Sequence, residues 1–88
     1  MRVCVTEWHI KTGSRTFYTT CPVANAITPL LPAGQVAHVY HDAVVVKDGN
    51  LKTVSRGEFP QDVTARIERF DCGDKLVPFE FDLELEKA

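Results

Sequence analysis

Residues 75–86 read KLVPFEFDLELE, and the fold predicted for the whole chain depends on them. Apolar residues alternate with acidic residues along this stretch. One side carries Val77, Phe79, Phe81, Leu83 and Leu85, and the other carries Glu80, Asp82, Glu84 and Glu86. Alternation with a period of two is typical of a strand with one buried and one solvated face. We therefore expect an extended ribbon whose apolar side closes the hydrophobic core, with Pro78 at its start or at a sheet edge.

The strongest strand signal upstream of the tail is Gln35–Lys47, which is rich in valine. Asp42 interrupts this run and predicts a break or a bulge near its middle. Residues 48–50 read Asp-Gly-Asn, and Asp-Gly is typical of a two-residue type I′ hairpin loop. Leu51–Arg56 is then predicted to return as the second strand of a hairpin.

The N-terminal residues favour another hairpin. Arg2–Ile10 alternates in the manner of a strand, and Arg15–Thr20 is rich in Thr, Phe and Tyr. The Lys-Thr-Gly-Ser segment at 11–14 has the composition of a turn. We expect the two segments to pair.

Residues 21–34 contain Pro22, Pro29 and Pro32, which argues against a continuous strand. Proline is accepted in the first turn of a helix, so residues 22–27 are predicted to form a turn or two. Residues 28–34 are then expected to be an ordered loop. In that loop, Leu30 and Leu31 either insert into the core or remain exposed for a partner.

The segment from Pro60 to Phe70 fits two structures, and the helix is favoured. Val63, Ile67 and Phe70 form an apolar stripe with helical spacing, and Gly73 lies just beyond its end. The alternative is a strand, because apolar and polar residues also alternate over 63–68. That alternation fails at residues 69–70.

These elements predict a single β-rich domain over residues 1–88. The expected class is α+β: a small antiparallel sheet or barrel of five or six strands with one helix near residues 60–71. An all-β sandwich or barrel is the alternative. The chain is 44% hydrophobic and 25% charged, which is typical of a globular protein.

Charge and cysteine content constrain the surroundings of the chain. The net charge is −2, and the tail is more acidic than the N-terminal half. An odd number of cysteines without a signal peptide argues against a disulfide framework. We expect a reducing cytoplasmic location, or a virion, and no membrane segment.

No motif in the sequence indicates catalysis or a cofactor. The available metal ligands lack zinc spacing, and they are Cys4, Cys21, Cys72, His9, His38 and His41. A nucleophile elbow, a glycine-rich phosphate loop and a paired-carboxylate signature are all missing. We therefore predict a protein that is not an enzyme, with no cofactor and no metal.

Nucleic-acid binding is the alternative function. Exposed aromatic rings on a small β domain can stack on bases while basic side chains follow the phosphates. The candidate residues are Trp8, Arg15, Tyr18, Lys47, Lys52 and Arg56. Phe17 and Tyr40 are further aromatic candidates. The competing interpretation is that the aromatic residues form the core, and the pI near 5.8 argues against a dedicated binder.

Protein–protein interaction is the function that the sequence favours, partly by elimination. The expected contacts are the acidic row and the loop leucines: Glu80, Asp82, Glu84, Glu86, Leu30 and Leu31. Four carboxylates spaced about 6.8 Å apart could also mimic phosphates, although charged residues on a strand commonly serve only solubility. By analogy with other chains of this size, we expect a phage or mobile-element accessory. Such a protein would inhibit a host enzyme or form a structural subunit of the virion. The partner and any self-association remain open.

Overall fold

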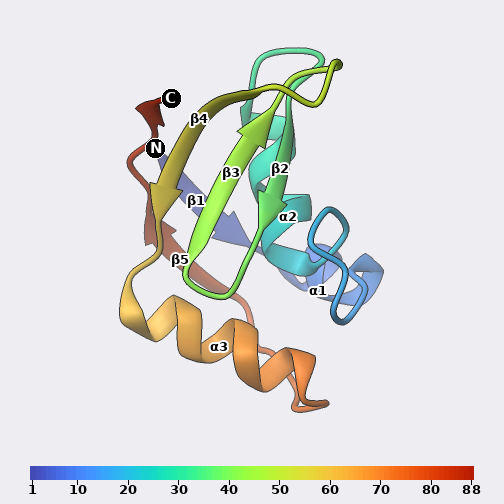
Figure 1. The fold of residues 1–88 in the computed structure, drawn as a ribbon. Helices are drawn as coiled ribbons and strands as arrows, with labels where there is room; N and C mark the ends of the chain where they lie inside the picture. The colour runs from blue at the N-terminus through green and yellow to red at the C-terminus, as the bar shows by residue number, and fades with distance from the viewer.

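The computed structural model describes residues 1–88, and its class is α+β, as predicted. It has three α-helices and two antiparallel sheets, of two and four strands, and no closed barrel. The all-β alternative is therefore wrong. In Figure 1 most of the four-stranded sheet lies in front, the strands β1 (Arg2–Val5) and β5 (Phe79–Asp82) lie behind it, and helix α3 (Gln61–Asp71) crosses its lower end.

The N-terminal hairpin is wrong. Strand β1 spans only Arg2–Val5, and it pairs with the distant β5, Phe79–Asp82. Helix α1, Glu7–Thr12, begins directly afterwards because Thr6 and His9 form a reciprocal capping box. The capping box therefore ends the strand at Val5, whereas the alternation predicted a strand that continues to Ile10.

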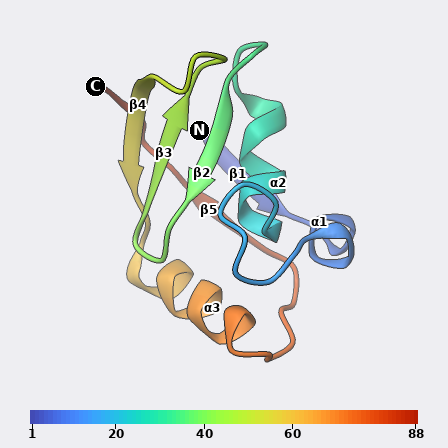
Figure 2. The ribbon, with the colours of Figure 1, turned by 45° about the vertical axis from the view of Figure 1, so that its right-hand side comes forward.

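The predicted returning strand at residues 15–20 is a loop of turns. It leads into α2, Pro22–Ile27, which has its proline at the first helical position, as expected. A short 3-10 helix, η1, follows over Thr28–Leu30. Helix α2 packs against both β1 and β2 (Val36–Val39), so it joins the two sheets at one side (Figure 2).

The predicted strand Gln35–Lys47 is two strands. Strand β2 spans Val36–Val39 and β3 spans Ala43–Lys47, and they pair as a hairpin. Asp42 lies in the tight turn between them, so it ends a strand instead of forming a bulge within one.

The hairpin at residues 48–50 is confirmed, with β4 over Thr53–Glu58. Its loop type is not the predicted type I′. The N–H of Leu51 donates to the carbonyl of Asp48, and Leu51 has a φ of 62°. This is a type I turn followed by a left-handed residue.

The helix near residues 60–71 is confirmed as α3, Gln61–Asp71, with Val63, Ile67 and Phe70 buried. Gly73, with a φ of 104°, lies just beyond the C-cap. Its N–H and that of Asp74 donate to the carbonyls of Phe70 and Arg69, which is a Schellman ending.

The tail is extended, but it is shared between the two sheets. Phe79–Asp82 forms β5, whereas Glu86–Lys87 forms β6 beside β4. Phe81 and Leu83 are buried as predicted, while Val77 is exposed because the strand begins only after Pro78. The tail crosses β4 at Gly57, where an added Cβ would lie 2.5 Å from the carbonyl oxygen of Glu84.

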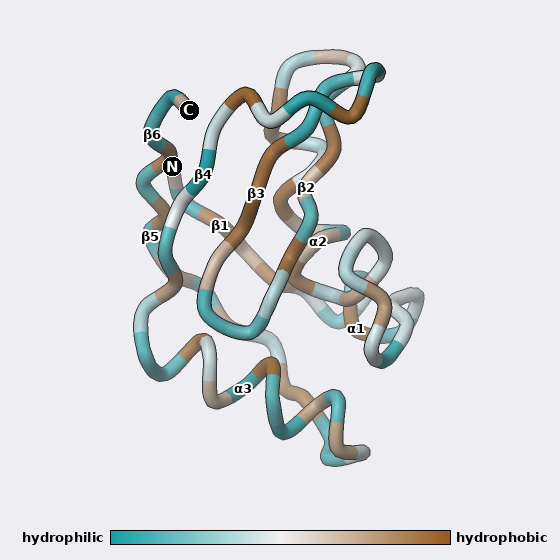
Figure 3. Tube along the Cα trace, in the orientation of Figure 1, coloured by the Kyte–Doolittle hydropathy of each residue, from teal (hydrophilic) through white to brown (hydrophobic).

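One hydrophobic core contains residues of both sheets, α2 and α3. Figure 3 shows the corresponding hydrophobic stretches of β1, β3 and α2, while the β2–β3 turn is hydrophilic. None of the helices has the length and apolar composition needed to cross a membrane.

Candidate functional site

The loop of residues 14–20 is fixed to the C-terminal end of α3. The backbone N–H of Thr16 donates to Oδ1 of Asp71 at 3.0 Å. The guanidinium of Arg15 donates to the carbonyl of Phe70 and lies 4.3 Å from the centre of its ring. Thr16 has a φ of 64°, an uncommon conformation for a β-branched residue that these contacts help to hold.

The same loop is also fixed to the edge of β2. The N–H of Val39 donates to the carbonyl of Tyr18 at 2.7 Å. The N–H of Ala37 donates to the hydroxyl of Thr28 at 3.1 Å. Both groups point away from β3, so the loop and η1 close an edge that could otherwise pair with another chain. Figure 2 shows the loop beside β2 and above α3.

Aromatic rings project from this anchored backbone into solvent. Phe17 is 62% exposed, Tyr18 51% and Tyr40 45%. The rings of Tyr18 and Tyr40 are stacked, with centroids 6.0 Å apart and planes 14° apart. Tyr18 also stacks on His38 at 5.2 Å. The interpretation of these aromatic residues as core is therefore wrong, and Trp8 is likewise exposed.

The rings border a depression of about 540 Å³. We call it the aromatic pocket. Its walls come from the 14–20 loop, the β2–β3 turn and α3, and it is lined by Thr16, Phe17, Tyr18, Cys21, Val39, Tyr40, His41, Asp42, Thr64, Ile67, Glu68 and Asp71. The depression is open to solvent, and its volume is sufficient to hold a side chain of a binding partner.

The charged groups of the aromatic pocket are mostly acidic. Nε2 of His41 lies 3.4 Å from Oδ2 of Asp71. The carboxylates of Asp42 and Glu68 make no hydrogen bond or ion pair within the chain, and no lysine or arginine lines the pocket. The pocket therefore offers aromatic faces and unpaired negative charge together.

Two thiols, one in the aromatic pocket and one on β1 away from it, are held in their protonated form. Cys21 caps α2 and lines the pocket, and burial raises the pKa of its thiol, with Asp71 adding to the shift. The exposed thiol of Cys4 donates to Oε1 of Glu80 at 3.1 Å, and this hydrogen bond raises its pKa. Since the thiolate is the nucleophile, neither environment activates a cysteine. No group of three or more His, Cys, Asp or Glu side chains is arranged to hold a metal ion.

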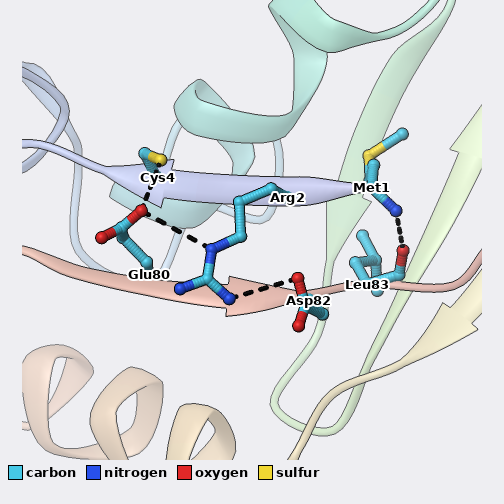
Figure 4. A network of polar contacts seen from close by, with 6 residues as sticks. All are labelled: Met1, Arg2, Cys4, Glu80, Asp82 and Leu83. Atoms are coloured by element: carbon cyan, nitrogen blue, oxygen red, sulfur yellow. Dashed lines mark hydrogen bonds and ion pairs between the residues drawn. The ribbon is translucent and has the colours of Figure 1, made fainter.

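The first half of the predicted acidic row takes part in an ion-pair network across β1 and β5. Nη1 of Arg2 lies 3.2 Å from Oδ1 of Asp82, and Nε of Arg2 lies 3.5 Å from Oε1 of Glu80 (Figure 4). Asp82, and to a smaller extent Glu80, raise the pKa of Arg2. The N-terminal ammonium of Met1 donates to the carbonyl of Leu83 at 2.6 Å. Glu80 and Asp82 are exposed but not free of partners.

The rest of the predicted contact set lies apart from the aromatic pocket. Glu84 and Glu86 border a second depression together with Arg56 and Glu58. Leu30 is 49% exposed, whereas Leu31 packs partly against the core.

Only part of the predicted nucleic-acid set shares one surface: Lys47 and Arg56 lie on the outer face of the four-stranded sheet, where Tyr18 stacks on His38. Trp8 lies on α1, and Arg15 is engaged with Phe70. Lys47 lies near the turn between β3 and β4, which Figures 1 and 2 place far from α1. Only Tyr18 lines the aromatic pocket.

Most of the pocket could not be identified from local patterns. Phe17 and Tyr40 were among the aromatic candidates, but no sequence pattern indicated that they would lie in the same pocket. His41 was considered only as a metal ligand and Asp42 only as a strand break, while Glu68 and Asp71 carried no signal. These residues meet only when α3 packs beneath the β2–β3 turn.

Comparisons with protein-family models, with curated proteins and with solved structures found no significant match.

Proposed function

We propose that this chain is a small, non-catalytic protein that acts by binding another protein through the aromatic pocket. The observation that carries the proposal is the exposure of Phe17, Tyr18 and Tyr40 on a backbone fixed from two sides. Aromatic residues are enriched at protein interfaces and supply much of their binding energy. A surface that is already ordered loses less conformational entropy on binding.

The environments of Cys4 and Cys21 support a non-catalytic role for these two thiols. The thiols of Cys4 and Cys21 have raised pKa values, so both are protonated at neutral pH. An accessory protein of a phage or mobile element, which inhibits a host enzyme or assembles into a virion, fits this mode of action. The acidic row and Leu30 remain predicted contacts of a second, separate surface.

The test is affinity capture with the immobilised protein from an extract of its native cells. The captured partner is purified, and its Kd is measured for the wild type and for the Phe17→Ala/Tyr40→Ala variant. We expect the double variant to bind about 30-fold more weakly, the usual effect of losing an interface hot spot. Trp8→Ala is the matched control, because Trp8 is an exposed aromatic residue outside the pocket.

An unchanged Kd in the double variant, with the fold intact by circular dichroism, would refute the pocket as the interface. Nucleic-acid binding is the second candidate, since Lys47 and Arg56 share the outer face of the sheet with His38. It would replace the proposal if a single-stranded oligonucleotide bound at low micromolar concentration in physiological salt, and the same double variant lost that binding.

A further inference from the structure

We infer that the aromatic pocket receives an arginine side chain from a basic segment of the partner protein. The inference rests on the proposed function and names the chemistry of its ligand. It follows from three features of the pocket: its aromatic faces, its unpaired carboxylates and its lack of any lysine or arginine from the chain itself.

The aromatic faces suit a planar cation. Tyr18 and Tyr40 are stacked and half-exposed, and Phe17 is more exposed still. An arginine guanidinium is weakly hydrated and stacks on such rings more readily than a compact ammonium does. The chain already uses this contact twice, with Arg15 over Phe70 at 4.3 Å and Arg66 over Phe79 at 4.9 Å.

The carboxylates supply the complementary charge. Asp71 is already engaged, because it accepts the N–H of Thr16 and lies beside His41. Asp42 and Glu68 both line the pocket without a partner, one from the β2–β3 turn and the other from α3. A guanidinium bound there can pair with a carboxylate while its flat face meets a ring.

The chain cannot fill this pocket with its own cations. Arg15, the arginine of the adjoining loop, is bound to the Phe70 carbonyl, away from the pocket lining. An anionic ligand is disfavoured because its phosphates would approach three carboxylates at once, those of Asp42, Glu68 and Asp71. Charge complementarity therefore selects a basic peptide over a nucleic acid.

The test uses short synthetic peptides with the intact protein. An N-acetylated, C-amidated peptide Gly-Arg-Gly-Arg-Gly is titrated and followed by the NMR signals of Phe17, Tyr18, Tyr40 and His41. We expect saturable shifts at these residues with a Kd near millimolar. The same peptide with citrulline, which keeps the shape but lacks the charge, should bind at least tenfold more weakly.

Two variants locate the charge contribution. Asp42→Asn/Glu68→Gln keeps the pocket shape and should weaken binding of the arginine peptide at least tenfold. The matched control Glu7→Gln/Asp62→Asn neutralises two exposed carboxylates outside the pocket that also lack a partner within the chain, and it should leave the Kd within twofold. Raising the salt concentration from 20 to 500 mM, chosen to screen exposed charges, should weaken binding to the wild type but not to the neutralised pocket.

Equal binding of the arginine and citrulline peptides, or shifts outside the pocket, would overturn the inference. A lysine peptide that binds as tightly would overturn the choice of arginine, and an oligonucleotide that shifts the same rings would overturn the charge argument. The two proposals fail separately. If the captured partner needs Phe17 and Tyr40 but arginine peptides do not bind, only this inference fails. If the peptides bind but partner capture ignores those rings, the proposed function fails.

Discussion

At the scale of single residues, two non-glycine residues have a left-handed backbone conformation that suits glycine better. Thr16 and Leu51 have positive φ values of 64° and 62°. Thr16 lies at the wall of the aromatic pocket, where the contact of its N–H with Asp71 helps to hold it. Leu51 is 71% exposed in the β3–β4 turn, so its side chain offers little packing in return.

We expect Leu51→Gly to stabilise the protein. The left-handed conformation costs an L-residue about 1–2 kcal/mol, part of which is offset by the greater flexibility of glycine in the unfolded chain. The expected net gain in the free energy of unfolding is about 0.5–1 kcal/mol, measured by urea denaturation. Asn50→Gly is the control, because Asn50 has no positive φ, and it should not stabilise. A loss of stability in Leu51→Gly would contradict the argument.

At the scale of elements, the tail shows where the alternation pattern holds and where it ends. Phe81 and Leu83 are buried, and the acidic residues between and after them are exposed, as the pattern predicts. Val77 continues the apolar pattern but lies before Pro78, outside the strand. Alternation therefore identifies the buried face of a strand but not its first residue.

Leu83→Ala and Val77→Ala should distinguish a tail residue that is buried from one that is exposed before the strand begins. Leu83 is 1% exposed, and its truncation should cost about 2–5 kcal/mol of the free energy of unfolding because it leaves a cavity. Val77 is 62% exposed, and its truncation should stay within about 0.5 kcal/mol. Urea denaturation of both variants measures the difference. Similar losses in both would mean that the tail packs along its whole length.

At the scale of the whole molecule, the outer face of the four-stranded sheet is open except where the 14–20 loop covers it. The ring of Tyr18 lies over His38, which is 8% exposed. Burial lowers the pKa of His38 below its ordinary value of 6.5, and Lys47 adds to the shift. The folded state therefore favours the neutral imidazole.

This linkage makes global stability depend on pH. The folded pKa lies below the unfolded value, so the unfolded chain binds a proton first. The contribution of neutral His38 is present above about pH 6.5 and is lost as the pH falls through 6.5 towards the lower folded pKa. We expect the Tm of the wild type to fall between pH 7 and pH 5. The Tm of the His38→Gln variant should fall less over the same range. An identical decline in the variant would assign the pH dependence to other groups.

The sequence by itself determined the features that local physics controls. The stripe of Val63, Ile67 and Phe70, with Gly73 beyond it, favoured the helix α3 over a strand and marked its ending. The turn at 48–50 specified a hairpin, and the alternating tail correctly predicted that Phe81 and Leu83 are buried. Each of these depends on residues within one turn or one strand, so the signal is contained in a short window.

Only the tertiary structure decided which segments meet. The pairing of β1 with β5 joins residues about eighty positions apart, and no local pattern encodes such a partner. The same holds for the aromatic pocket, where a loop, a turn and a helix end each contribute a few side chains. Strand pairing and pocket assembly depend on how separate apolar faces bury one another, and that choice is made by the molecule as a whole.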